Sequence, residues 1–95
     1  MLNQPVLITT AHRGVFFGTL TEWDVDRQIA TLTDARNCFY WSKCGGFLDL
    51  AASGPRDGSK VGAAVASLVL PNVTSIAVCS AAAAAAWREI KVWTE

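Results

Sequence analysis

An arginine, an asparagine and three aromatic rings lie close together in residues 35–42, which read ARNCFYWS. Arg36 offers a forked cation that suits a phosphate group, and Asn37 can hydrogen-bond the edge of a base. Tyr40 or Trp41 can stack on a flat ring. These residue types predict a pocket for a small, charged, ring-bearing ligand such as a nucleotide. The alternative is structural, with Trp41 in the core and Tyr40 at its rim.

Strand geometry limits how these side chains share a site. Successive residues of a strand point to opposite faces, so only one of Tyr40 and Trp41 can lie on a given face with Arg36. We therefore expect one ring in the core and the other beside Arg36. The sequence does not say which ring takes which place.

Three further residues can contact an anion. His12 and Arg13 precede Gly14 in a predicted tight turn, from which they can reach a phosphate or carboxylate; the alternative is a solvated turn. Lys43 follows the aromatic segment. Because Arg13, Arg36 and Lys43 all lie in the first half of the chain, a local basic patch is possible despite the balanced total charge.

Metal binding is disfavoured by spacing. Cys38, Cys44 and Cys79 with His12 have the ligand types of a tetrahedral zinc site. However, five residues separate Cys38 from Cys44, and the chain has no C-x-x-C pair. We expect small buried thiols, and neither a metal nor a cofactor.

Catalytic motifs are not evident in the chain. It has no nucleophile elbow, no H-E-x-x-H, no P-loop and no paired carboxylates at a telling spacing. Glu22, Asp24 and Asp26 fit a solvated turn better than an acid–base pair. We therefore expect that the protein is not an enzyme.

Composition points to one domain and to self-association. The 95 residues fit a single domain, 1–95, yet 52% are hydrophobic and only 17% charged. A small domain cannot hide that much apolar surface in one copy, so we expect a homo-oligomer. Eight basic residues balance eight acidic ones, which makes nucleic acid an unlikely partner.

The cellular location is predicted from the absence of targeting features in the sequence. The start MLNQPVLITT has no features of a secretory leader, so we expect free thiols in a reducing cytoplasm. The apolar run 76–87 is too short to span a bilayer, so no membrane association is expected.

The first half of the chain predicts a curved antiparallel meander. Residues 5–42 contain four apolar or alternating segments, with polar turns predicted near residues 12–14, 24–28 and 34–37. Gly18 lies inside the second segment and predicts a bend or a close backbone approach, which helps a sheet curl.

The second half adds two helices. A short helix is predicted between Gly45–Gly46 and Gly54–Pro55, and residues 61–70 fit either a strand or a helix, with a strand near 60–65 preferred. A strand follows Pro71. Ser80 is then a predicted N-cap of a helix that starts with the alanine run, and residues 91–93 form a possible last strand. Trp87 and Ile90 share a face of that helix, which either docks on the sheet or forms an oligomer interface.

The first half also resembles a known fold. Residues 6–35 resemble the first three strands of the Sm and wider SH3-like small β-barrels, in the turn Arg13–Gly14, the run Gly18-Thr19-Leu20, the acidic Asp24 and the strand 29–32. This resemblance implies an α+β protein: a small curved antiparallel sheet or barrel, SH3/Sm-like, with one short inserted helix and a short C-terminal helix. Barrels of this sort often form rings.

A wider resemblance covers nearly the whole chain. RGVFFGTL (13–20), AR with YW (35–41), LDLAASG (48–54), VTSIAVCS (73–80) and VW (92–93) resemble the pattern of a family of small uncharacterised bacteriophage proteins. It implies a phage-encoded accessory protein in the host bacterial cytoplasm, with no known activity.

Three functions fit these features. The first is a non-enzymatic protein that sequesters a nucleotide-type immune signalling molecule of the host, as a counter-defence. The second is an inhibitor that binds a host defence protein directly through its apolar and aromatic surface. The third is an Sm-like nucleic-acid-binding module, which the barrel resemblance favours and the zero net charge disfavours.

Overall fold

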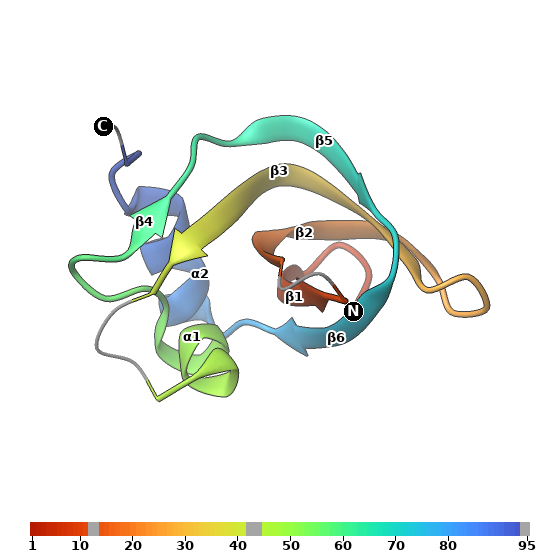
Figure 1. The fold of residues 1–95 in the computed structure, drawn as a ribbon, viewed down its shortest axis with the longest axis horizontal. Coiled ribbons are helices and arrows are strands. Elements are labelled where there is room, and N and C mark those ends of the chain that lie inside the picture. The colour runs from red at the N-terminus through yellow and green to blue at the C-terminus, as the bar shows by residue number, and fades with distance from the viewer. Residues whose placement is uncertain (12–13, 42–44, 94–95) are drawn as a thin grey trace.

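The protein is a small antiparallel β-sheet with two helices (Figure 1). The computed structural model describes residues 1–11, 14–41 and 45–93. In chain order its elements are β1 Pro5–Thr10, β2 Val15–Asp24, β3 Ile29–Tyr40, α1 Phe47–Ser53, β4 Lys60–Val61, β5 Val65–Leu70, β6 Val73–Val78 and α2 Ala81–Glu89. The expected α+β class is confirmed at this level.

The sheet is strongly curved and almost wholly a meander. β1, β2 and β3 pair antiparallel in sequence order, β5 continues the sheet beyond β3, and β6 returns to pair with β1. The two-residue strand β4 pairs with the last residues of β3. Figure 1 shows the sheet curling so that β5 and β6 lie on opposite sides of β1, while both helices lie at one end.

Strand β1 is the centre of the fold. Val6, Leu7 and Ile8 are all completely buried, although neighbouring residues of a strand point to opposite faces. Both faces of β1 are therefore covered, which explains why this segment is a continuous apolar run rather than an alternating one.

Each face of the sheet supports its own hydrophobic core. Val6 and Ile8 point into the inside of the curl, and Leu7 points toward the helices. The inner core consists of Val6, Ile8, Leu20, Ala30, Leu32, Ala35, Leu70 and Val73. The core under the helices consists of Leu7, Val15, Phe17, Cys38, Leu50, Ala51, Val61, Cys79, Ala83, Ala84 and Trp87.

The predicted turn at residues 34–37 is wrong, because β3 runs through it. Two steps on β2, from Phe17 to Thr19, face three steps on β3, from Arg36 to Thr33, so β3 carries a bulge there. Asp34 takes the left-handed conformation at φ 51° within this bulge. An aspartate that tolerates this conformation also favours turns, which accounts for the incorrect prediction.

Opposite the bulge, Gly18 permits the close backbone approach that the sequence predicts. A Cβ at Gly18 would lie 3.0 Å from the Leu32 Cβ and 3.1 Å from the Thr33 carbonyl oxygen. Any side chain there would force β2 away from β3 at the point where the sheet bends.

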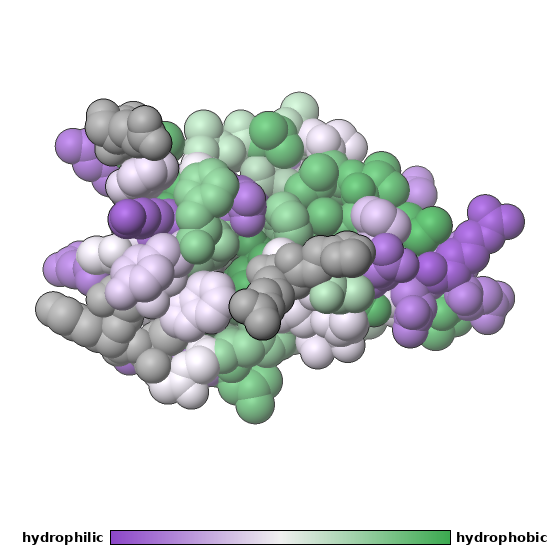
Figure 2. All heavy atoms as spheres, in the orientation of Figure 1, coloured by the Kyte–Doolittle hydropathy of each residue, from purple (hydrophilic) through white to green (hydrophobic). Residues whose placement is uncertain are grey.

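The turn between β2 and β3 is solvated, as expected. Glu22, Asp24 and Asp26 are exposed, and the Asp24 carboxylate accepts hydrogen bonds from the N–H groups of Asp26 and Arg27. Figure 2 shows hydrophilic residues gathered at this tip of the molecule, on the right.

The second half follows most of the sequence-based predictions. The inserted helix and the strand after Pro71 are present as α1 and β6. The open question over residues 61–70 resolves to strand at Val61 and at Val65–Leu70, but residues 62–64 are not strand, so the preferred single strand near 60–65 is not observed. Ser80 is the N-cap of α2, because its side chain accepts the Ala83 N–H at 3.0 Å. Residues 91–93 do not form the last strand; there, the Trp93 N–H donates to the Val61 carbonyl at 3.0 Å.

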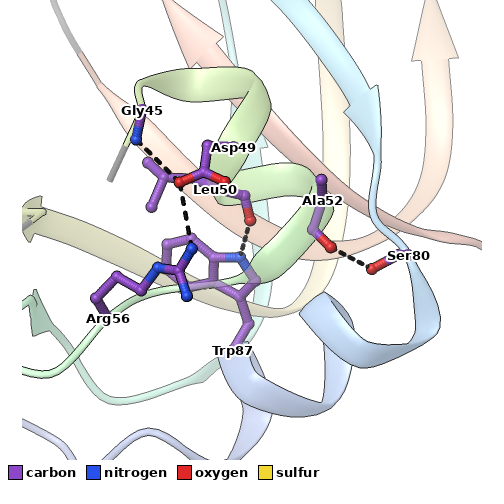
Figure 3. Close-up of polar contacts among 7 residues, drawn as sticks. All are labelled: Gly45, Asp49, Leu50, Ala52, Arg56, Ser80 and Trp87. Carbon is purple, nitrogen blue, oxygen red and sulfur yellow. Dashed lines mark hydrogen bonds and ion pairs between the residues drawn. The ribbon is translucent and has the colours of Figure 1, made fainter. Parts of the chain in front are cut away.

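The two helices dock on each other and on the sheet (Figure 3). The Trp87 indole N–H donates to the Leu50 carbonyl at 3.1 Å, and the Ser80 hydroxyl donates to the Ala52 carbonyl at 2.7 Å. Trp87 is completely buried and stacks on Phe17 with ring centroids 5.7 Å apart. Of the two roles considered for Trp87, docking is therefore the one observed.

A hydrogen bond and an ion pair to Asp49 stabilise the start of α1. The Gly45 N–H donates to the Asp49 carboxylate at 2.9 Å, and Arg56 lies 3.7 Å from the same oxygen (Figure 3). The Gly45 hydrogen bond, followed by the charge of Arg56, holds the pKa of Asp49 below its usual value. Neither helix in the described ranges is long and apolar enough to cross a membrane.

Candidate functional site

The exposed aromatic residues gather near the end of β3 and at the C-terminal segment. Four aromatic side chains are classed as exposed among the described residues: Phe39 at 55%, Tyr40 at 51%, Trp41 at 42% and Trp93 at 38%. The chain has nine aromatic residues, so nearly half of its rings face solvent. Large exposed rings are costly unless they bind something.

Tyr40 and Trp93 lie beside Lys60, and Phe39 lies against Trp93; we call these four residues the aromatic cluster. The Lys60 ammonium lies 4.9 Å from the centroid of the Trp93 ring and 5.8 Å from that of Tyr40. Phe39 meets Trp93 edge to face, with centroids 6.1 Å apart. The cation is thus held against aromatic faces, which carry negative charge density.

Backbone pairing brings these residues together from three parts of the sequence. Tyr40 and Lys60 are direct partners in the β3–β4 ladder. Trp93 reaches the same place because its N–H bonds to Val61, the next residue of β4. The short strand β4 therefore positions both the lysine and the second ring beside the end of β3.

The surroundings of the cluster carry positive charge. Among the described residues Lys60 makes no ion pair, and its ammonium lies over the rings of Tyr40 and Trp93. A second lysine, Lys91, lines a hollow of about 280 Å³ with Ser59, Val92 and Trp93.

Trp41 lies in a separate, apolar pocket. This pocket has a volume of about 380 Å³ and is lined by Thr9, Gly14, Val15, Trp41, Phe47 and Leu50. The only polar side chain in that set is the Thr9 hydroxyl, which bonds to Thr74 at 2.8 Å. The pocket suits an apolar group or a ring rather than a phosphate.

The prediction of one buried ring is wrong. Tyr40 and Trp41 are both exposed. The sheet ends at Tyr40, so only the earlier residues of β3 are covered by the helices on one face and by the curl on the other. Rings beyond that point have no core to enter.

Arg36 does not join either ring. It is only 5% exposed; its Nε donates to the Gly62 carbonyl at 2.7 Å, and its Nη1 donates to the carbonyls of Trp87 and Ile90 at 2.8 and 2.9 Å. Burial lowers the pKa of the guanidinium. The arginine therefore binds the end of α2, and it lines a different cavity, of about 200 Å³, with Phe17, Thr19, Asp34, Ala64 and Arg88.

Of the other predicted site residues, the structure describes only Asn37. Asn37 is half-buried, and its backbone carbonyl oxygen accepts a hydrogen bond from the Gly62 N–H at 2.9 Å. His12, Arg13 and Lys43 lie outside the described residues, as does Cys44. Cys38 and Cys79 are both buried.

The sequence does not predict Lys60, Lys91 or Phe39 as site residues, and it predicts Trp93 only as part of a possible last strand. Lys60 follows a polar loop, and the lysines and Trp93 have no motif linking them to the aromatic run. Only the β3–β4 pairing, which a two-residue strand makes hard to predict, brings them together.

The fold and these rings define a small antiparallel β-protein with two helices and a lysine-centred aromatic cluster on its surface. A family model described as Domain of unknown function (DUF6948) matches residues 3–87, and the chain belongs to this family. No curated protein matches the chain. Family membership assigns no activity.

Proposed function

We propose that the protein is a non-enzymatic binder of a nucleotide-type molecule and that the aromatic cluster is its binding site. The observation that carries this proposal is the Lys60 ammonium held 4.9 Å from the Trp93 ring. A nucleotide combines a flat ring with anionic phosphates. Exposed rings stack with the base, and neighbouring lysines neutralise the phosphates.

The phosphate-binding role moves from Arg36 to the lysines in this proposal. All the hydrogen bonds of Arg36 go to backbone carbonyls. Lys60 and Lys91, in contrast, lie beside Trp93 at the surface. Tyr40 keeps its predicted role as a stacking residue.

The biological setting rests on the sequence resemblance. If the chain is a bacteriophage protein, capture of a nucleotide-type signal in the host cytoplasm is a way to silence host defence. A sequestering protein needs affinity and abundance but no catalytic groups, which fits the set of residues around Lys60.

We also propose that the sheet is a small, incompletely closed barrel of the SH3/Sm kind, in which β5 and β6 remain unpaired with each other. The support is the strand order, in which the meander β1–β2–β3 continues into β5 and the last strand, β6, returns to β1. The bend at Gly18 and the bulge at Asp34 provide the curvature that such a barrel needs.

Isothermal titration calorimetry tests the site, with adenosine mononucleotides, cyclic dinucleotides and NAD as probes. Lys60→Gln removes one charge–phosphate contact, and we expect about tenfold weaker binding. Arg27→Gln is the matched control, because it removes one exposed positive charge from the turn between β2 and β3, and Figure 1 shows that turn far from β4. Equal affinities for the two variants, or no binding of any probe by the parent protein, would contradict the proposal.

A second function is favoured by a different observation. Phe39, Tyr40, Trp41 and Trp93 are all exposed, and aromatic residues are enriched in protein interfaces. The protein is then an inhibitor that binds a host defence protein directly. Thermal stabilisation by a nucleotide, and its loss in Trp93→Leu, would favour the first function over this one.

The third function, an Sm-like nucleic-acid module, is the weakest of the three. It requires phosphate contacts, and the chain as a whole has no net positive charge. An oligonucleotide affinity that falls steeply with salt concentration would favour it over the other two.

A further inference from the structure

One long part of the chain carries no charge. Every charged residue lies outside residues 61–87, a segment that includes β5, β6 and most of α2. This segment is not simply buried: Val65, Val69 and Val78 are exposed by 48%, 59% and 46%. Figure 2 shows hydrophobic colouring along the upper edge of the molecule, where Figure 1 places β5.

Strand β5 is an open edge. It pairs with β3 on one side, and within the described residues no strand pairs with its other side. None of the loop and turn hydrogen bonds involves residues 65–70. The backbone groups on that side are therefore free to pair with another strand.

This edge lacks the protection that edge strands normally have. Natural proteins place lysine, proline or a bulge on an exposed edge to prevent pairing between copies. β5 has the sequence VASLVL and a continuous register with β3, and four of its six residues are exposed. An uncharged, regular, valine-rich edge is a template for strand pairing.

We propose that β5 pairs antiparallel with β5 of a second copy across a two-fold axis, which makes the protein a homodimer. A strand edge is self-complementary under such an axis, because each donor of one copy meets an acceptor of the other. The absence of charge from β5 argues against a partner recognised by charge. It also removes any repulsion between two identical edges.

The dimer continues the sheet of one copy into the other. Val65 and Val69 alternate along β5, so they lie on one face and become neighbours of the same residues in the second copy. The pairing covers apolar surface that the core of a single copy leaves exposed. This inference concerns a different surface from the aromatic cluster and does not depend on nucleotide binding.

Sedimentation equilibrium tests the dimer. We expect the parent protein to show twice the mass of one chain, and Val69→Lys to weaken association about tenfold or more, because it places a charged side chain on each of the two paired edges. Val25→Lys is the matched control, since Val25 is 68% exposed in the turn between β2 and β3. Its association should equal that of the parent.

Hydrogen exchange supplies the second measurement. The outward-facing amides of residues 65–70 should exchange slowly in concentrated parent protein and quickly in Val69→Lys at the same concentration. A parent protein that stays monomeric, a larger assembly, or a dimer that Val69→Lys leaves intact would overturn the proposal.

Discussion

Replacement of Arg36 is expected to lower the stability of the protein strongly. Its three hydrogen bonds join the middle of β3 to the end of α2 and to Gly62, which follows β4. Two of the acceptors, Trp87 and Ile90, are carbonyls near the C-terminal end of α2. Such carbonyls lack partners inside the helix and carry the negative end of its dipole.

The magnitude can be worked from these contacts. A hydrogen bond from a charged donor contributes roughly 1.5–3 kcal/mol, so three contribute about 4.5–9 kcal/mol. Burial of a guanidinium with no acidic partner costs several kcal/mol of desolvation, and its Nη2 makes no hydrogen bond in the described part of the chain. We expect Arg36→Met, which keeps the length of the side chain without its donors, to lower the free energy of unfolding by about 3 kcal/mol.

Chemical denaturation followed by tryptophan fluorescence measures this loss. A change of about 3 kcal/mol corresponds to a melting temperature lower by roughly 12–24 °C in a domain of this size. Arg36→Lys should lie between the parent and Arg36→Met, since a single ammonium cannot reach all three carbonyls. Parent-like stability of Arg36→Met combined with lost nucleotide binding would refute the reasoning and return Arg36 to the role of a ligand contact.

Two further predictions concern residues next to the helices: Gly54 follows α1, and Cys79 precedes the N-cap of α2. Gly54→Ala should destabilise the protein by about 2–4 kcal/mol in thermal unfolding, because φ is +81° and a Cβ would lie 2.7 Å from that of Ala86. Gly46→Ala, at φ +108° in open space, should cost less, about 1–3 kcal/mol, because only the backbone conformation is strained. Burial raises the pKa of Cys79 from 9.0 to about 11. The contribution of the protonated Cys79 thiol to the free energy of unfolding is full below pH 9. It is lost as pH rises toward 11, because the thiol loses its proton at a lower pH in the unfolded chain than in the folded one. Cys79→Ala should therefore reduce the loss of stability at alkaline pH by roughly 3 kcal/mol. A common alkaline stability profile for parent and Cys79→Ala, or equal losses for the two glycine variants, would contradict these expectations.

Local signals in the sequence were enough to place most of the elements. The apolar run at β1, the glycines around α1 and the Ser80 cap each depend on nearby residues. The bulge at Asp34 was mistaken for a turn because the same left-handed conformation occurs in both. Only the register of β3 against β2 separates the two cases.

The site was harder to predict because it is assembled over long sequence distances. Arg36 has the residue type of a phosphate ligand, but whether it contacts a ligand or a helix end depends on where α2 docks, more than 50 residues later. The aromatic cluster joins Tyr40, Lys60 and Trp93 through a strand of two residues. No periodicity in the sequence signals so short a strand.

The central claim is that a nucleotide-type molecule binds at the aromatic cluster, and the indole N–H signals test it most directly. The chain has four tryptophans, so its ¹H–¹⁵N spectrum holds four such signals. On titration with the nucleotide probes, we expect the Trp93 signal to shift and that of Trp87, buried and bonded to Leu50, to stay in place. A Trp93 signal that does not move under any probe, or a shift of Trp41 alone, would contradict the account.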